Sequence, residues 1–567
     1  MQDNLNFFDE FNKSPEKETL KNNPIAYFCA EFALTSSMPI YAGGLGVLAG
    51  DLLREASDRS FPIVGVGLYY NDGYETLHNV NEEGFIAAPH IHKSPESFGL
   101  EPVMGDNEKP IKITIPIEGR QVAVRAWRWQ TGTIPVFLLD TDCEENASDD
   151  RRITDHLYVI DRQMRLKQEI VLGIGGARML REFKVDPAAY HMNDGHPSLL
   201  SYELIGRLIK EKHLSFDDAV REASGKIVFT NHTLVTGGQE IFNDDLISLL
   251  LSDFMEEMGI PANNFLSLGR IQDASSFSLT QLSFNVAGAT NAVSKIHSKY
   301  AKGLWPNHPL QPITNGIHVP SWNGIKDEAF WESHIENKRA LLAKIHMMKN
   351  LDWQDTDFII AWARRLVEYK RPTAMLDDIA KLKEMLNNSD KPVRFVFSGR
   401  LHPSDTTGEE ILKKVVEMIE KEVPGSAVFL PDYDLDLARL LTSGCDIWVN
   451  TPIVGFEACG TSGMKAALNG VLPVSTLDGW IAEIDLLGRG FPLDNDNITA
   501  SLMGILKNEI IPLFFERDEK GVPQKWLANM KNCREMIKND FSATRMLREY
   551  IERLYTPFIS RTESHPL

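Results

Sequence analysis

The sequence is poor in cysteine, and the few cysteines it has are scattered. There are five in 567 residues, and none lies in a CxxC pair. Zinc sites and disulfide frameworks both need clustered or evenly paired cysteines, so we predict neither a disulfide framework nor a metal site. An odd number of dispersed thiols favours a reducing compartment, and we predict a cytoplasmic location.

Long apolar runs and an excess of positive charge are also missing. No stretch of 18 or more apolar residues occurs, and the acidic N-terminus lacks the apolar run of a signal peptide, so we expect no membrane partner. Lysine and arginine number 59 against 79 aspartate and glutamate, which leaves a net charge of −20. Such a chain is a poor match for nucleic acid, whereas a neutral polysaccharide is compatible with it.

The chain does contain the pattern of an α/β protein. Short apolar strands alternate with amphipathic helical segments, among them a predicted helix at residues 169–183, and this alternation favours parallel sheets. The length calls for at least two domains. We predict strands at residues 23–33, 61–70, 189–192, 226–230, 358–363, 393–398, 427–430, 446–450 and 471–476.

A segment rich in glycine, proline and asparagine, residues 312–325, marks the predicted joint between two domains. We therefore expect two doubly wound, Rossmann-like domains that face a cleft, one over residues 1–325 and one over residues 326–567. The last helix, at about residues 542–554, starts with a serine cap and is expected to pack back on the first domain.

The strongest chemical signal is the segment EACGTSGMKAALN, residues 457–469. It follows an apolar strand and opens a helical pattern, where small residues with free backbone N–H groups form an anion cradle. Lys465 stands one turn into this helix, where a desolvated amine can form a Schiff base with an aldehyde cofactor. On spacing alone, a tight turn with a surface lysine fits about equally well.

A basic run, RRLVEYKR at residues 364–371, directly follows the predicted strand 358–363. Cations at the carboxyl end of a sheet strand favour a phosphate site, because α/β folds bind ligands there. A basic helix surface is the alternative for the run taken alone.

Polar motifs follow strands in the first half of the chain: NDGHP at residues 193–197 and NHT at residues 231–233. ITNG lies in the predicted joint, and the glycine loop AGGLGVLA spans residues 42–49 without the GxGxxG spacing of a dinucleotide site. A lone histidine after a strand is more often structural than functional, so each of these motifs is weak by itself.

Together the motifs resemble the glycogen/α-glucan phosphorylase family, in its short archaeal and bacterial type. Residues 457–469 resemble the family signature EASGTxxMKxxxN, and the basic run resembles KRxHEYKRQ. The first-half motifs resemble NDTHP, TNHT, ITNGVTPRRW and NGGLGRLAA, so the resemblance extends from about residue 27 to about residue 478. It implies a GT-B glycosyltransferase fold and an enzyme that transfers glucose from an α-1,4-glucan to inorganic phosphate, giving glucose 1-phosphate with retention.

The resemblance also implies roles for single residues. Lys465 matches the lysine that carries pyridoxal 5′-phosphate, and Arg365, Lys370 and His232 match catalytic residues at the substrate phosphate and the cleaved bond. The 5′-phosphate of the cofactor is assigned to Thr461, Ser462, Gly463 and Arg364. The glucose at the cleavage point is assigned to Gly44, Leu45, Asp194, His232, Asn315, Glu457, Cys459 and Gly460.

The resemblance further implies how the reaction proceeds. The phosphate of the cofactor would exchange a proton with the substrate phosphate, since its second pKa near 6 suits acid–base work at neutral pH. No carboxylate pair of the hydrolase type stands out among the motifs, which agrees with a phosphate-driven route.

The chain departs from the family pattern at several positions. Cys459 stands where serine is usual, Arg364 where lysine is usual, and Val367 where histidine is usual. Asp434 replaces an arginine of the large enzymes, and residues 453–456 replace an Arg/Pro-rich stretch. These changes bear on the electrostatics of the cofactor site and on the preferred substrate.

Two other functions stay open. A nucleotide-sugar-dependent glucan synthase shares the expected fold, but such enzymes usually carry a lysine where Ala42 stands and lack a counterpart of Lys465. A catalytically silent glucan-binding homologue is compatible with the departures at Val367 and residues 453–456. The sequence does not define the oligomeric state, and a homodimer is compatible with it.

Overall fold

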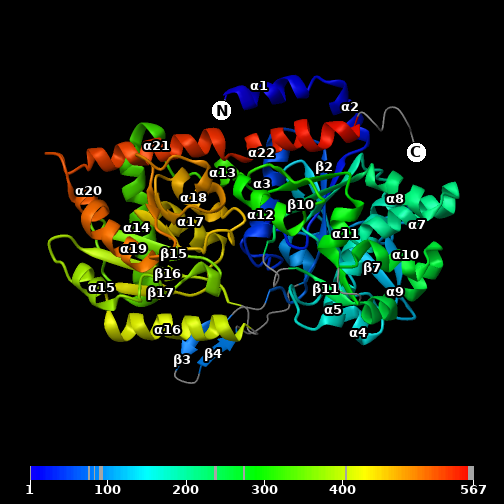
Figure 1. Cartoon of the computed structure of the whole chain (residues 1–567), viewed down its shortest axis with the longest axis horizontal. Coiled ribbons are helices and arrows are strands. Elements are labelled where there is room, and N and C mark those ends of the chain that lie inside the picture. The colour runs from blue at the N-terminus through cyan, green and yellow to red at the C-terminus, as the bar shows by residue number, and fades with distance from the viewer. Residues whose placement is uncertain are drawn as a thin grey trace.

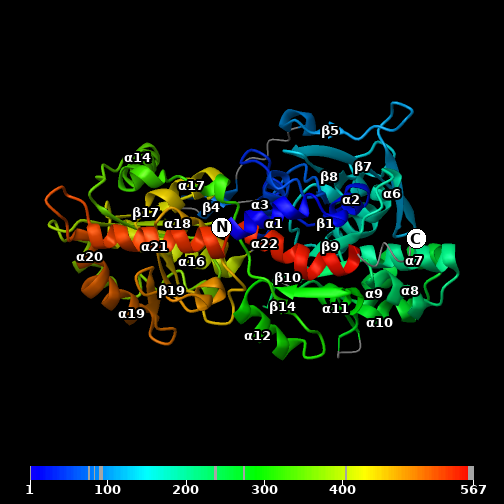
Figure 2. The ribbon, with the colours of Figure 1, turned by 90° about the horizontal axis from the view of Figure 1, so that it is seen from above.

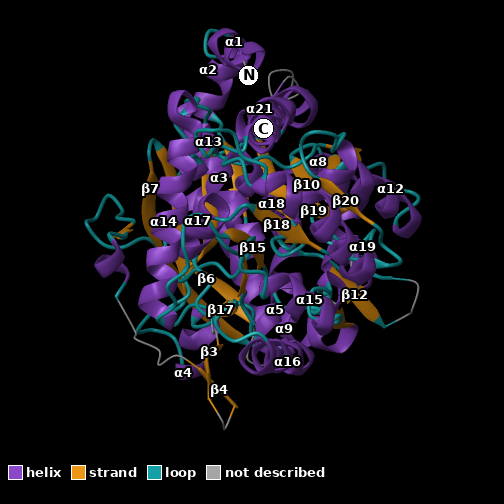
Figure 3. Cartoon of the chain, turned by 90° about the vertical axis from the view of Figure 1, so that its left-hand side faces the viewer, coloured by secondary structure: helices purple, strands orange, loops and turns teal. Residues whose placement is uncertain are grey.

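The computed structural model describes residues 2–74, 77–81, 84–87, 94–234, 239–271, 275–401 and 405–559. Figure 1 shows the N-terminal part of the chain on the right and the later part on the left, each with strands enclosed by helices. Seen from the left-hand side, the helices flank the strands on both faces (Figure 3). The protein is therefore α/β with parallel sheets, as the alternation of strands and helices predicted.

The first sheet has ten strands. Its order is β14-β13-β10-β9-β1-β2-β8-β7-β5, with β6 beside β7, and every pair from β14 to β8 is parallel. The strands, in the order of the sheet, are β14 Gln311–Pro312, β13 Ala289–Ala292, β10 Ile227–Asn231, β9 Ala189–Asn193, β1 Ile25–Phe28, β2 Ile63–Leu68, β8 Ile134–Asp140, β7 Arg120–Thr131, β5 Glu101–Pro102 and β6 Lys112–Ile117.

The second sheet has six strands, and all of its pairs are parallel. The strands, in the order of the sheet, are β17 Ala427–Leu430, β16 Val393–Ser398, β15 Phe358–Ala363, β18 Ile447–Asn450, β19 Leu472–Thr476 and β20 Phe491–Leu493. Two short antiparallel pairs complete the strands: β3 Leu77–Asn81 with β4 Gly84–Ala87, and β11 Ile241–Asn243 with β12 Ser276–Ser278.

The two sheets reverse direction in the same way. Each begins at a central strand, β1 or β15, fills the sheet on one side of it, and then returns past the first strand to build the other side. In such sheets, ligands bind outside the carboxyl ends of the strands at the point where the winding direction reverses. These points lie between β1 and β9 in the first sheet and between β15 and β18 in the second.

Strand β15 shows why the second sheet is buried on both faces. All six of its residues are buried, and Phe358, Ile360 and Trp362 pack in one hydrophobic cluster. Ile359 and Ala361 pack in a different cluster, because successive side chains of a strand point to opposite faces. Such continuous apolar strands are typical of parallel sheets covered by helices on both sides.

The helices that cover the first sheet include one that is interrupted. Arg162 starts α5, seven residues before the predicted helix 169–183, because the Asp161 side chain caps it by accepting from the Met164 N–H at 2.7 Å. The π-helical stretch η3 then joins α5 to α6. The helices of this part are α1 Gln2–Phe11, α2 Pro15–Asn22, α3 Gly44–Asp58, α4 Ser148–Arg151, α5 Arg162–Ile170, η3 Val171–Gly175, α6 Gly176–Glu182, α7 Leu200–Lys212, α8 Phe216–Ser224, α9 Asp244–Met258, α10 Ala262–Gly269, α11 Leu279–Val286, α12 Lys295–Leu304 and α13 Val319–Trp322.

The last two long helices divide between the two sheets. In Figure 2 they run end to end, α21 over the part on the left and α22 over the part on the right. Helix α22 begins at the Ser542 cap, and its Met546 and Tyr550 belong to the hydrophobic cluster of the first sheet. The helices of the second part are α14 Phe330–Lys349, α15 Ile379–Leu386, α16 Thr406–Glu422, α17 Leu435–Gly444, α18 Thr461–Leu468, α19 Ile498–Ile505, η8 Leu506–Ile510, α20 Ile511–Phe515, α21 Gln524–Asp540, α22 Ala543–Tyr550 and η9 Ile551–Tyr555.

Several expectations need correction. The predicted strand 23–33 is too long: β1 ends at Phe28, because the backbone beyond it pairs with α3, where the Ala33 N–H donates to the Gly46 carbonyl at 2.9 Å. The antiparallel strands β6 and β7 were not predicted. The prediction that no run of 18 apolar residues occurs is not contradicted: the helix Ile498–Phe515 could cross a membrane by length and composition only, and Lys507 and Glu509 interrupt its apolar residues. One face of it, with Leu502, Leu506 and Phe514, packs in the cluster of the second sheet.

The state of the cysteines agrees with the prediction that the chain has no disulfide framework. All five cysteines are free and buried, so none forms a disulfide.

Candidate active site

Lys465 is buried in the second turn of α18. Its Nζ lies 4.3 Å from the centre of the Trp322 ring, and the Trp322 indole N–H donates to Asp51 at 2.9 Å. Burial lowers the pKa of Lys465 to about 8, despite the favourable charge of Asp51. Asn469 fixes the neighbourhood, since its side-chain amide donates to the carbonyls of both Lys465 and Trp322 at 2.9 Å. Lys465 is therefore a buried amine with an increased neutral fraction near neutral pH.

The N-terminus of α18 is formed by small residues. Gly460 caps it at φ 84°, a left-handed conformation that suits glycine, and no side chain caps the helix. Thr461 and Gly463 are buried and Ser462 is half-buried, so the first turn offers backbone N–H groups inside the protein. This is the geometry that the anion-cradle hypothesis required.

Two cations of the basic run converge on one carboxylate. Glu457 Oε2 lies 3.3 Å from Arg364 Nη1 and 3.3 Å from Lys370 Nζ, and all three residues are buried. Burial lowers the pKa of Lys370 to about 7, against the attraction of Glu457. The Asp478 carboxylate holds this loop by accepting from the Glu457 N–H at 2.9 Å. The residues come from the ends of β15 and β18, the point where the second sheet reverses.

Arg365, another cation of the run, is exposed beside this buried group. Its charge acts on Glu457 and on the Tyr369 phenol, whose ring stacks on Phe456 with centroids 6.0 Å apart. Within the described residues, Arg364 Nε has no hydrogen-bond partner although it is buried. The group thus presents three cations against one carboxylate, an excess of positive charge that suits an anion such as phosphate.

In the first sheet, the predicted sugar residues follow β9 and β10. Asp194 has a φ of 67°, and its carboxylate accepts from the Gly195 N–H at 3.0 Å and the Thr233 hydroxyl at 2.9 Å. His232 Nε2 lies 2.6 Å from Asn193 Oδ1. Burial lowers the pKa of His232 to about 3, so its imidazole is neutral at physiological pH.

Asn315 brings the first sheet close to the lysine loop. Its Oδ1 is buried and has no hydrogen-bond partner among the described residues, which is unusual for a buried polar atom. The sulfur of Cys459 faces the Asn315 backbone, and burial raises the pKa of that thiol. One residue earlier in that loop, the Ala458 carbonyl accepts from the Ser294 hydroxyl at 2.6 Å.

Gly44 and Leu45 open helix α3 next to the reversal point of the first sheet. A Cβ built on Gly44 would meet nothing within 4 Å, so the backbone there is accessible. Leu45 is half-buried. No hydrogen bond or ion pair within the described residues joins Lys465 or the Gly44 region to the Arg364–Glu457–Lys370 group.

The departures from the family pattern have local structural roles. Asp434 caps α17 by accepting from the Leu437 N–H at 2.8 Å, so a helix cap stands where the family pattern of the large enzymes has an arginine. Val367 is half-buried directly before the short helix Glu368–Lys370. Phe456 and Ile453, in place of the basic stretch, are exposed.

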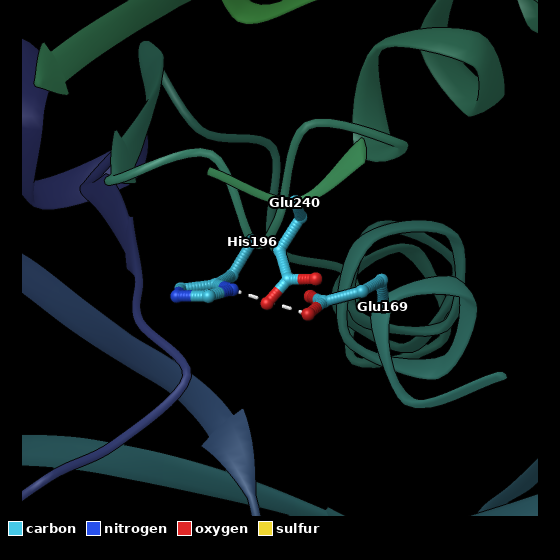
Figure 4. A group of neighbouring side chains, drawn as sticks. All are labelled: Glu169, His196 and Glu240. Atoms are coloured by element: carbon cyan, nitrogen blue, oxygen red, sulfur yellow. Dashed lines mark hydrogen bonds and ion pairs between the residues drawn. The ribbon is translucent and has the colours of Figure 1, made fainter. Parts of the chain in front are cut away.

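A cluster of metal-binding residue types lies behind Asp194. Figure 4 shows His196 pointing toward Glu169, with Glu240 beside them. The Arg165 guanidinium lies 3.0 Å from Glu169 and 3.1 Å from Glu240. Arg165 therefore already supplies the positive charge that a metal ion would supply between these carboxylates.

The structure adds residues that the motifs did not single out. Trp322, Tyr369 and Arg400 all lie next to predicted site residues. Tyr369 lies in the basic run itself, and Arg400 follows the end of the predicted strand 393–398. Polar residues just after a strand were the pattern that indicated Arg364, so the same pattern also indicates these two residues. Trp322 ends the segment that resembles ITNGVTPRRW, but the motif gave it no role, because its contact with Lys465 depends on how α13 packs on α18.

The geometry defines an α/β protein with a cationic group of side chains after the strands of one sheet and a polar group without cations after the strands of the other. A family model described as carbohydrate phosphorylase matches residues 144–302 and 323–555. The maltodextrin phosphorylase of Thermococcus litoralis is 35% identical over 94% of this chain and 70% of its own length. The glycogen phosphorylase of Aquifex aeolicus is 32% identical over 97% of this chain and 88% of its own length. The glycogen phosphorylase of Mycobacterium tuberculosis is 32% identical over 94% and 71%. The chain therefore belongs to the carbohydrate phosphorylase family, as the resemblance indicated.

Proposed function

We propose that this protein is an α-1,4-glucan phosphorylase that transfers the terminal glucose of a glucan to inorganic phosphate and releases glucose 1-phosphate with retention. The observation that carries the proposal is the cationic group of Arg364, Arg365 and Lys370 around Glu457, on loops beside the Lys465 helix. Relatives named maltodextrin and glycogen phosphorylase support the same reaction.

The proposal includes the arrangement of the chain. The two sheets would be two domains of the GT-B type, divided near residue 325, with the substrate cleft between them. Contacts between the two parts are compatible with a cleft that both parts line. The Thr314 hydroxyl and the Lys295 backbone N–H, both of the first part, each donate to the Glu483 carboxylate of the second part at 2.8 Å. Closing such a cleft excludes water and favours transfer to phosphate over hydrolysis.

The residues around Lys465 fit pyridoxal 5′-phosphate. A buried amine with a pKa near 8 suits covalent attachment of an aldehyde, and Lys465 would hold the cofactor there. Thr461, Ser462 and Gly463 at the helix start would bind its phosphate, and the Nε of Arg364, which has no hydrogen-bond partner among the described residues, offers a further donor. When bound, the cofactor supplies a phosphate group whose second pKa near 6 suits acid–base chemistry at neutral pH.

The two pockets would divide the substrates. Asp194, neutral His232 and Asn315, whose Oδ1 has no partner among the residues the structure describes, would provide hydrogen-bonding groups for glucose hydroxyls. Glu457, Cys459 and Gly460 would join them from the second sheet. Arg365 and Lys370 would hold the phosphate dianion, and Gly44 and Leu45 would approach both substrates through their backbone. The fixed cations stabilise the charge that develops on the phosphate oxygens as the glucosyl bond breaks.

The protein would act in the cytoplasm on maltodextrin, glycogen or starch with inorganic phosphate, without nucleic acid or membrane partners. A homodimer stays a prediction.

The test is to incubate the protein, loaded with pyridoxal 5′-phosphate, with maltodextrin and phosphate and to assay glucose 1-phosphate. We expect phosphate-dependent product. A synthase would ignore phosphate and require a nucleotide sugar, and a silent homologue would bind maltodextrin without forming any product. Either result would refute the proposal.

A further inference from the structure

Arg400 reaches from the second sheet to the glycine loop of the first. It follows β16, and its Nη1 lies 3.2 Å from the carbonyl oxygen of Tyr41 and 3.3 Å from that of Ala42. Its guanidinium also lies 4.9 Å from the centre of the Tyr41 ring. These contacts place a cation against the carbonyl side of the peptides that precede Gly44.

An anion faces the opposite side of the same peptides. The buried Glu31 carboxylate accepts from the N–H groups of Ala42 and Gly43, the latter at 3.1 Å. Tyr158 donates to the other oxygen of Glu31 at 3.2 Å, which fixes the carboxylate. Because the N–H and C=O of a peptide point in opposite directions, a cation at the carbonyls and an anion at the amides together define the orientation of the loop.

The backbone of Arg400 is tied to the cationic run. Its carbonyl accepts from the Leu366 N–H at 3.2 Å, one residue after Arg365. A movement of the run therefore moves Arg400, and with it the loop that opens α3 at Gly44. Since Gly43 caps α3 without a side-chain hydrogen bond, the loop depends on Glu31 and Arg400 for these polar contacts.

We propose that Arg400 is a positioning residue that couples the glycine loop of the first sheet to the phosphate-binding cations of the second. This inference rests on the proposed function for its effect on catalysis. Arg400 would act through the loop: it places the backbone of Gly44 and Leu45 against the phosphate side of the cleft. The loop and the cations then already have their relative positions before substrates bind, which reduces the conformational entropy that is lost when phosphate binds.

The test compares Arg400→Gln, which removes the charge, with Arg400→Lys, which keeps it. Arg339→Gln is the matched control, because Arg339 pairs with Asp355 on the outer surface of the second part. In the cofactor-loaded enzyme we expect Arg400→Gln to raise the KM for phosphate about tenfold, the loss typical of one charge-assisted hydrogen bond, while kcat changes less than about threefold. Arg400→Lys should restore most of the KM, and the control should match the parent.

Hydrogen exchange at the Ala42 and Gly43 amides provides a readout that needs no catalysis. Exchange there should accelerate at least about tenfold in Arg400→Gln and stay near the parent rate in Arg400→Lys, which keeps the inference testable if the first variant folds poorly. Unchanged exchange together with a raised KM would show that Arg400 binds phosphate directly and would overturn the inference. Unchanged exchange and KM would overturn it as well. A parent protein that forms no glucose 1-phosphate would defeat the proposed function, whereas faster exchange would still support the coupling.

Discussion

Both sheets reverse direction at a central strand, but they carry different chemistry at the carboxyl ends of their strands. After β9 and β10 stand groups without net positive charge: Asp194, and His232 with a pKa of about 3. After β15 stand Arg364, Arg365 and Lys370. The same topology therefore provides two places for a ligand, and the residues just beyond each strand decide which ligand each place suits.

The two pockets also differ in how their polar groups are satisfied. In the first sheet, Asp194 is held by the hydroxyl of Thr233 and a backbone amide, so a fixed acceptor is ready for a neutral sugar. In the second, Glu457 balances only part of the positive charge around it. A site with more cations than carboxylates suits a dianion, because the bound anion offsets the repulsion among the cationic side chains.

Lys465→Ala should have the largest effect, because it removes the amine that would hold the cofactor. We expect complete loss of the bound cofactor's absorbance and of phosphorolysis, whereas maltodextrin binding by the first sheet should persist. Absorbance spectra and glucose 1-phosphate assays measure these effects, and circular dichroism verifies the fold. A variant that keeps both cofactor and activity would refute the assignment.

Arg365→Ala should distinguish phosphate binding from glucan binding more clearly than any other substitution. Loss of one cation at the phosphate typically costs about 2–4 kcal/mol of transition-state stabilisation, or about 30- to 1,000-fold in rate. We expect this loss together with a higher KM for phosphate, while glucan affinity stays within about twofold. Steady-state kinetics and maltodextrin titration measure the two effects. Arg339→Ala is the control, and an Arg365→Ala variant as active as the parent would contradict the division.

The sequence predicted the elements that carry the site well. The strands at residues 358–363, 393–398 and 427–430 agree with β15, β16 and β17, because buried parallel strands are short continuous apolar runs bounded by polar turns. The motifs that directly follow such strands were therefore placed at the correct edge of each sheet.

Contacts between distant segments could not be predicted. The pairing of Glu457 with Lys370 and that of Arg400 with Ala42 depend on how loops fold over each other, which no local pattern encodes. Strand β7 was missed for a different reason: its second half has an exposed face with the polar residues Arg128 and Gln130, a pattern typical of a surface segment. The fold class follows from local patterns, whereas the electrostatics of the site follows from packing.

The pH dependence of phosphate binding should be a smaller effect, confined to the second sheet. Burial lowers the pKa of Lys370 to about 7, far below the value near 10.4 of a free lysine. Above pH 7 the amine of the free enzyme is increasingly neutral, so a dianion must bind together with a proton. We expect the KM for phosphate to rise by up to about tenfold per pH unit between pH 7.5 and about 9, with little change in glucan affinity.

Lys370→Arg provides the control for this prediction, since a guanidinium keeps its charge throughout that range. Its KM for phosphate should be nearly independent of pH, whatever its absolute value. Isothermal titration calorimetry in buffers of different ionisation enthalpy should show proton uptake by the parent protein and not by the variant. Equal pH profiles for the two proteins would show that Lys370 is not the titrating group.

Cys459→Ser should have the smallest effect, and it tests the boundary between the two regions. Cys459 belongs to the lysine loop, yet its sulfur faces the backbone of Asn315 from the other part. Burial raises the pKa of its thiol, so the group stays protonated and acts there as a small, neutral, weakly polar side chain. A serine hydroxyl is nearly isosteric and its oxygen can accept a hydrogen bond from the same backbone, so we expect kcat/KM for both phosphate and glucan to stay within about threefold of the parent. Cys459→Val is the contrast, because a branched side chain of greater volume crowds a buried site, and overpacking typically costs about 1–3 kcal/mol.

If the two regions meet at Cys459, the valine should lower glucan affinity through Asn315 and leave cofactor absorbance unchanged. A serine variant with a large loss of phosphate binding alone would place Cys459 in the cationic pocket and contradict this boundary.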